Sequence, residues 1–210
     1  MSPTIEVFYS FRSPYCYLLT RRLVALAVDF DAAVLIRPVY PIAVRDPEFF
    51  SRVDPLYRPY HLQDSARLAE FYGIPYRRPQ PDPIVQDLES GHIAASQPYI
   101  RRITRMAQAA ADDGKGLEYA CAVMTLLWDG DTDNWHEGEH LAKACGAAGL
   151  DFAALDARAG RDADALDAAI ESNQEAQRAA GHWGVPLMVF NGEPFYGQDR
   201  FDLLCWRLAQ

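Results

Sequence analysis

The sequence predicts an α/β fold in which a large all-α block separates a front half from a back half. A strand–helix–strand pattern occupies about residues 4 to 38, and two strands and a helix occupy about residues 185 to 208. Between them the apolar spacing is almost entirely helical. We therefore expect one unit formed by residues 1–44 and 181–210, and a helical insertion formed by residues 45–180.

The front half begins with an apolar run over residues 5–9 and continues with helical spacing from Pro14 to about Val28. Ser13 and Pro14 are the residue types that a helix prefers at its N-cap and at its first position. A second apolar run over residues 33–37 ends at Pro38. Its unbroken apolar character predicts a strand that is buried on both faces.

The middle of the chain opens with a segment, residues 39–60, that holds four prolines and many aromatic residues. This composition predicts a loop with one or two short helical turns. Gly73 and a proline-rich connector to about residue 83 separate the first helix from the others. We expect helices over about residues 63–72, 97–112, 117–128 and 135–148, and two over 152–180 that are split near 160–162.

The back half is predicted from its turn. Asn191-Gly192 is a strong two-residue hairpin signal between the apolar runs 185–190 and 193–196. A last helix is expected over residues 201–208.

Composition excludes several classes of function. The net charge of -9 argues against a nucleic-acid-binding surface and against anionic membranes, because both need a basic patch. No apolar run is long enough to span a bilayer, and the N-terminus lacks the pattern of a secretory signal, so we expect a cytoplasmic protein. The four cysteines are widely spaced and are expected to be reduced thiols.

Two patterns resemble metal sites. The run His136-Glu137-Gly138-Glu139-His140 fits H-E-x-x-H, but Gly138 weakens a helix there and the flanks are acidic. The run over residues 129–133 begins like a calcium loop, but its later ligand positions do not fit. We expect no metal site, and a zinc hydrolase is only a third interpretation.

The stretch over residues 10–16 is the strongest functional candidate. A strand that leads into a helix opened by Ser13 and Pro14 leaves backbone N–H groups and the positive end of a helix dipole at one place. Such a place stabilises an anion, including a thiolate. The alternative is that Ser13-Pro14 only starts a helix.

The order βαβ, helical block, ββα is that of a thioredoxin fold with a helical insertion. Together with Phe11-Arg12-Ser13-Pro14-Tyr15-Cys16-Tyr17-Leu18, Gly184-Val185-Pro186 and the segment 195–200, it resembles a branch of the DsbA-like family. That branch contains the 2-hydroxychromene-2-carboxylate isomerases and the kappa-class glutathione transferases. The resemblance covers the whole chain and is specific at its two ends.

The resemblance implies a glutathione site. Ser13 matches the family serine whose hydroxyl donates to the glutathione sulfur, and Ser13 to Cys16 occupy the C-x-x-C position of redox relatives. Val185-Pro186 matches a cis-proline step that pairs with the ligand backbone. The γ-glutamyl end of glutathione is expected at Tyr196, Gly197, Gln198 and Asp199.

The same resemblance places basic and aromatic residues around the ligands. Arg58 is expected at the glycyl carboxylate, although the family usually has a lysine near this position. Arg45 is expected at an acidic substrate, with Tyr40 and Tyr57. Further aromatic residues that could form the wall of a pocket are Phe49, Phe50, Tyr60 and Trp183.

The implied activity is a glutathione-dependent isomerase or transferase that acts on a conjugated aromatic small molecule, with glutathione as cofactor and a homodimer as the expected assembly. The alternative is a DsbA-like redox or glutathione-binding protein that uses Cys16 and has no isomerase activity. Cys16 lacks the partner cysteine that an intramolecular disulfide cycle requires.

Overall fold

A four-stranded mixed sheet forms the centre of the computed structural model, which describes residues 2–87 and 92–210. The strands are β1 (Thr4–Tyr9), β2 (Ala33–Pro38), β3 (Leu187–Phe190) and β4 (Glu193–Tyr196). Their order is β2-β1-β3-β4, with β2 parallel to β1 and the other two pairs antiparallel. The sheet therefore joins the two ends of the chain, as the sequence predicts.

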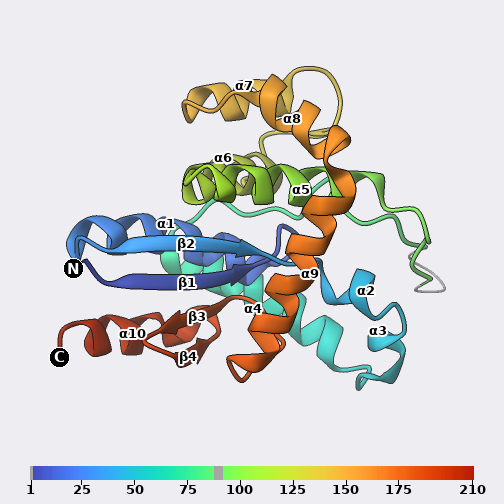
Figure 1. The fold of residues 1–210 in the computed structure, drawn as a ribbon. Helices are drawn as coiled ribbons and strands as arrows, with labels where there is room; N and C mark the ends of the chain where they lie inside the picture. Colours follow the sequence, from blue (N-terminus) through green and yellow to red (C-terminus); the bar gives the residue numbers. More distant parts are fainter. Residues whose placement is uncertain (1, 88–91) are drawn as a thin grey trace.

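Helices cover the sheet and extend beyond one edge of it (Figure 1). The longer ones are α1 (Pro14–Asp29), α4 (Tyr57–Tyr72), α5 (Pro98–Asp112), α6 (Gly116–Trp128), α7 (His140–Ala147), α8 (Phe152–Arg161), α9 (Ala163–Ala179) and α10 (Phe201–Leu208). The short ones are α2 (Ile42–Arg45), α3 (Phe49–Arg52) and the 3-10 turn η1 (Gln198–Arg200). In Figure 1, α9 crosses one face of the sheet, α1 lies behind it, and α7 and α8 form the outermost layer.

Local chemistry explains why several elements begin and end where they do. Ser13 caps α1, and Gly73, in the left-handed conformation with φ 62°, ends α4. The turn between β3 and β4 places Asn191 and Gly192 at φ 50° and 79°, which is the geometry of the expected hairpin. These three predictions are confirmed.

The prediction that β2 is buried on both faces is wrong. β2 is an edge strand, and Leu35 on it is 46% exposed. An apolar run indicates that a segment forms a β-strand. How many strands lie beside it depends on the rest of the chain.

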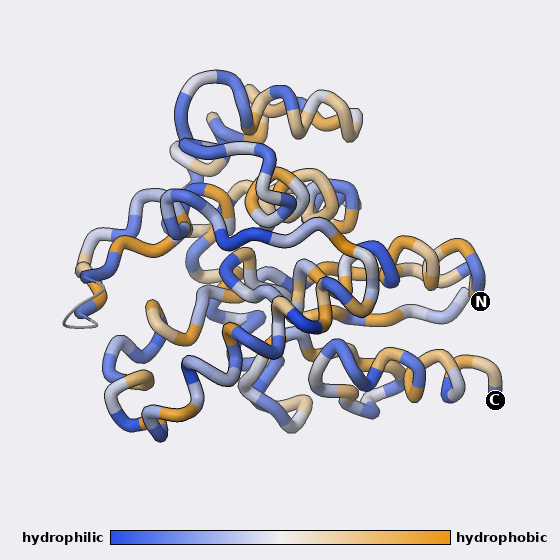
Figure 2. Tube along the Cα trace, turned by 180° about the vertical axis from the view of Figure 1, so that it is seen from behind, coloured by the Kyte–Doolittle hydropathy of each residue, from blue (hydrophilic) through white to orange (hydrophobic). Residues whose placement is uncertain are grey.

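Two helices have different limits from those predicted. Helix α4 begins at Tyr57, six residues before the predicted start, because Pro59 lies in its first turn, where a missing N–H costs no hydrogen bond. Helix α7 begins at His140, so His136 lies in the preceding loop. Figure 2 shows this loop as largely hydrophilic.

A large hydrophobic core joins the sheet to the helices. Its largest fully buried side chains include Tyr9, Phe11, Tyr119 and Trp135, which come from β1, the loop after it, α6 and the loop before α7. Trp128 at the end of α6 donates from Nε1 to the carbonyl of Phe11 at 3.1 Å, and so fixes the loop that leads to Ser13. No helix within the described residues is both long and apolar enough to cross a lipid bilayer.

Candidate active site

Ser13 lies at the end of the loop between β1 and α1, directly before the first turn of α1. Its backbone has φ -93° and ψ 117°, and its Oγ accepts a hydrogen bond from the N–H of Cys16 at 3.3 Å. The N–H of Ser13 in turn donates to the carbonyl of Ser10 at 3.1 Å. The hydroxyl also has a proton to donate: it lowers the pKa of the Cys16 thiol in the first turn of α1, and it donates to no side-chain oxygen or nitrogen of the described residues.

A cavity of about 120 Å³ opens above Ser13. We call it the Ser13 chamber. Three segments supply most of its wall: the α1 loop, the α2–α4 region, and the loop before β3. The lining residues are Ser10, Arg12, Ser13, Pro14, Tyr15, Pro41, Ile42, Arg45, Phe49, Phe50, Tyr57, His61, Trp183, Gly184, Val185 and Tyr196.

The loop before β3 brings Val185 into this wall. The Val185–Pro186 peptide bond is cis, as the resemblance implies. Gly184 is held on both sides, because its N–H donates to Nδ1 of His182 and its carbonyl accepts from Gln177. The backbone N–H and C=O of Val185 make no hydrogen bond within the described residues. They are therefore available to pair with the backbone of a peptide-like ligand.

Cys16 does not reach the chamber. Its side chain is fully buried, and burial raises its pKa to about 12, although hydrogen bonds from Ser10 and Ser13 oppose the shift. A thiol in this state is protonated at neutral pH and inaccessible.

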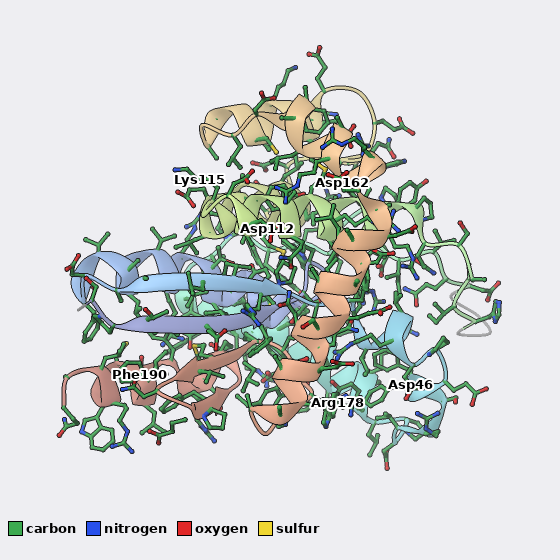
Figure 3. All side chains as sticks on the ribbon, viewed as in Figure 1. Asp46, Asp112, Lys115, Asp162, Arg178 and Phe190 are labelled. Carbon is green, nitrogen blue, oxygen red and sulfur yellow. The ribbon has the colours of Figure 1, made fainter. Side chains whose placement is uncertain are left out.

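Arg45 forms part of the wall of the Ser13 chamber, on the side of α2. Its Nη1 donates to Gln177 at 3.3 Å and its Nη2 to the carbonyl of Trp183 at 3.2 Å. Burial and the nearby Arg178 lower the pKa of Arg45 to about 10, so it is still charged at neutral pH. Figure 3 labels Arg178, on α9, and Asp46, which directly follows α2.

A second cavity, of about 110 Å³, adjoins the first. We call it the Arg58 chamber. The two share Arg12, Pro14, Phe50, Tyr57 and His61. Its remaining lining residues are Arg58, Leu62, Tyr76, Arg78, Gln86, Ile93 and Trp128.

The Arg58 chamber combines positive charge with a flat aromatic wall. The rings of Tyr76 and Trp128 stack with centroids 5.8 Å apart. Three guanidinium groups line the chamber, and Asp82 pairs with two of them, Arg12 at 2.9 Å and Arg78 at 3.1 Å. Arg58 has no ion-pair partner in the part of the chain that the structure describes. The chamber therefore suits an electron-poor or anionic aromatic group.

Asp82 holds the shared wall in place. Burial alone would raise its pKa, but Arg12 and then the N–H of Ile84 and Arg78 outweigh this effect, so the pKa of Asp82 is lowered. The carboxylate stays ionised and fixes Arg12 between the chambers.

The γ-glutamyl residues predicted from the resemblance lie beyond the chamber wall, except for Tyr196. Gln198 is buried, and its side chain accepts from Arg22 and Tyr72. Asp199 is exposed and accepts from Arg200 at 3.0 Å. Neither side chain lines the Ser13 chamber, and nor do Pro186 and Gly197.

The structure also separates the aromatic residues. Phe49, Phe50, Tyr57 and Trp183 line the Ser13 chamber, whereas Tyr40 and Tyr60 do not. Tyr40 is buried against α9 and donates from its hydroxyl to Asp167 at 2.5 Å. It therefore supports the core of the helical region.

The sequence-based prediction gave no individual role to several lining residues, among them Ser10, Arg12 and His61. Ser10 has a buried hydroxyl with no partner among the described residues, Arg12 lies between the chambers, and His61 faces both. Tyr57 and His61 are four residues apart and share a helix face. If α4 had been predicted to begin at Tyr57, this spacing would have predicted that His61 lies beside Tyr57 in the site.

The suspected metal pattern does not form a ligand set. His136 lies in a loop and His140 begins α7, so the two imidazoles do not share a helix face. Among the described residues, no three His, Cys, Asp or Glu side chains gather closely enough to hold a metal ion.

A model of the DSBA-like thioredoxin domain family matches residues 4–209. This chain belongs to that family. No curated protein matches it in sequence. The family match and the four-stranded mixed sheet agree with the thioredoxin-like fold that the sequence predicts.

Several solved structures share the fold at low sequence identity. A 2-hydroxychromene-2-carboxylate isomerase has 20% identity and a TM-score of 0.73, with 98% of this chain and 94% of that chain covered. A probable DsbA oxidoreductase from Streptomyces coelicolor has 19% identity and a TM-score of 0.67, with 99% and 89% covered. The cytosolic disulfide reductase DsbM from Pseudomonas aeruginosa, solved with GSH, has 18% identity and a TM-score of 0.60, with 99% and 100% covered.

Proposed function

We propose that this protein binds glutathione in the Ser13 chamber and directs its thiolate at a conjugated aromatic electrophile, as an isomerase or a glutathione transferase. One observation carries the proposal. Ser13 lines the chamber at the start of α1 and carries a hydroxyl that can donate to a bound sulfur, while Cys16 is fully buried. In redox relatives this position holds the nucleophilic cysteine. Here it holds the hydroxyl of Ser13, which can stabilise the thiolate of a bound ligand.

In this proposal each chamber binds one of the two substrates. The Ser13 chamber offers the free backbone groups of Val185 to a peptide-like thiol, and the structure of DsbM with GSH is a precedent within the fold. The Arg58 chamber offers an aromatic wall and positive charge to the second substrate. In this proposal residues 1–44 and 181–210 mainly bind the thiol, and residues 45–180 mainly bind the electrophile.

The reaction needs positioning and electrostatics more than acid–base chemistry. The thiolate adds to the double bond of the electrophile, and the electron pair moves to the conjugated oxygen. In an isomerase the adduct rotates about the former double bond and then expels the thiolate. In a transferase water supplies a proton to carbon and the thioether is released. The protein holds the sulfur and the carbon together.

The alternative function is redox chemistry at Cys16, which the family membership also supports. It requires an accessible thiolate, and the burial and raised pKa of Cys16 oppose this.

We also propose that the protein acts in the cytoplasm as a homodimer. The cytosolic neighbour supports the compartment, and light scattering of the purified protein tests the assembly.

Titration calorimetry with glutathione tests the proposal. We expect binding in the millimolar range or tighter, and weaker binding of S-methylglutathione, which cannot form a thiolate. Turnover is then followed with benzylideneacetone, a conjugated aryl enone. Cys16→Ala should retain turnover. No heat at millimolar glutathione, or loss of turnover in Cys16→Ala alone, would contradict the proposal.

A further inference from the structure

His61 lies at the junction of the two chambers. It is on the second turn of α4, its side chain is half-buried, and it lines both cavities. A thiol bound beside Ser13 and an electrophile bound beside Arg58 would meet at the wall that the chambers share. His61 is one of the five residues of that wall.

Two aromatic rings fix the orientation of the imidazole. The ring of Tyr15 lies edge-on to it with centroids 5.0 Å apart, and the ring of Tyr57 lies 5.7 Å away on its own helix. The hydroxyl of Tyr15 is itself held by Asp64 at 2.8 Å. Within the described residues no hydrogen bond or ion pair engages the imidazole nitrogens of His61. The ring is therefore held by packing while its nitrogens are available to a ligand.

The surroundings keep this imidazole neutral. Burial lowers the pKa of His61, and Arg78 from the connector and Arg12 from the α1 loop lower it further. Asp64, one turn along α4, acts in the opposite direction but does not reverse the shift. The rings of Tyr15 and Tyr57 also face the imidazole, and burial raises the pKa of both hydroxyls. A neutral imidazole carries one N–H donor at neutral pH.

The geometry points to His61 as the catalytic hydrogen-bond donor to the oxyanion that forms on the electrophile. This inference rests on the proposed thiolate addition. The S–C bond forms at the far carbon of the conjugated system, the C=C π pair shifts, and the carbonyl oxygen takes the negative charge. The N–H of His61 stabilises this enolate oxygen. The enolate then either expels the thiolate or takes a proton from water at carbon.

If His61 donates to the oxyanion, the rate lost on its removal depends on the electrophile. A purely structural role of His61 would affect all electrophiles equally. Benzylideneacetone develops an oxyanion when a thiolate adds to it. Benzyl chloride is attacked at carbon and releases chloride, so no oxygen becomes charged. A hydrogen-bond donor to an oxyanion therefore accelerates the reaction of benzylideneacetone and has no effect on that of benzyl chloride.

The test compares both reactions in His61→Phe, which keeps a flat ring between Tyr15 and Tyr57 but has no N–H. We expect kcat/KM for benzylideneacetone to fall about 100-fold and that for benzyl chloride to change less than about 2-fold. Glutathione affinity and thermal stability should be retained. His61→Gln, which keeps an N–H donor, should recover part of the lost rate. The matched control is His140→Phe, at an exposed position outside both chambers.

The outcomes separate this inference from the proposed function. Equal kcat/KM ratios of variant to wild type for the two electrophiles, whether reduced or unchanged, overturn the role of His61 alone. A wild-type protein that binds no glutathione and converts neither electrophile overturns the proposed function and this inference together. Selective loss with benzylideneacetone, restored in part by His61→Gln, supports both.

Discussion

The carboxylate of Asp82 holds the guanidinium of Arg12 by two hydrogen bonds, Nε to Oδ1 at 2.9 Å and Nη2 to Oδ2 at 3.1 Å. The two residues are seventy positions apart. Arg12 belongs to the loop that presents Ser13, and Asp82 belongs to the connector after α4. This pair joins the connector after α4 to the loop that leads to Ser13.

Asp82→Ala should lower the free energy of unfolding by about 2 kcal/mol, less than the ~3–5 kcal/mol of a fully buried pair, because both side chains keep some exposure. The pKa of Asp82 is lowered in the folded state, so its contribution is present above its unfolded pKa, about 4, and is lost as the pH falls through the lower folded value. Urea denaturation at pH 7 and pH 3 measures the difference. Glu139→Ala, in an exposed pair, is the control; a pH-independent loss in Asp82→Ala would contradict the prediction.

Two variants of Ser13 separate capping from thiolate stabilisation. Ser13→Ala loses both roles, whereas Ser13→Asp keeps an oxygen that caps α1 but places a negative charge where the thiolate would lie. We expect Ser13→Ala to lose about 1 kcal/mol of stability and Ser13→Asp to lose little. Turnover of benzylideneacetone should fall at least about 100-fold in both. Full turnover by Ser13→Asp would show that the hydroxyl only starts the helix.

Ser10→Ala should weaken glutathione binding without destabilising the fold. Ser10 lines the Ser13 chamber, and its buried hydroxyl has no partner among the described residues, so its removal leaves no group unsatisfied. Calorimetry should show affinity about 3- to 10-fold lower, the equivalent of one hydrogen bond. Thr104→Val is the matched control, since it removes another buried hydroxyl without a described partner, outside both chambers. Equal glutathione affinity in the two variants would count against a role for Ser10.

Cys16 should resist alkylation in the folded protein. With a pKa raised to about 12, on the order of one thiol in ten thousand is ionised at pH 8, and the side chain has no access to solvent. Mass spectrometry after treatment with iodoacetamide should find Cys205, which is partly exposed, modified first, and Cys16 modified only in denaturant. Rapid labelling of Cys16 between pH 7 and pH 9 would favour the redox alternative.

Much of the fold could be predicted from local patterns. The hairpin at Asn191-Gly192, the cap at Ser13 and the end of α4 at Gly73 each depend on a few neighbouring residues. Two expectations differ from the structure for different reasons. The burial of β2 depends on which strands lie beside it, and local periodicity does not contain this information. The start of α4 at Tyr57 lies in the predicted loop because a proline, here Pro59, is tolerated in the first turn of a helix.

The sequence by itself determined the family resemblance, the order of elements and the helix start at Ser13, because these depend on residue type and short spacing. Only the tertiary structure decided which side chains meet. It buried Cys16, brought the hydroxyl of Tyr40 into contact with Asp167, and kept Arg45 and Arg58 in different chambers. It also placed Ser10, Arg12 and His61 in the wall of the Ser13 chamber. The physical reason is that such a wall is formed by segments far apart in the chain, and their meeting is set by the packing of the shared core.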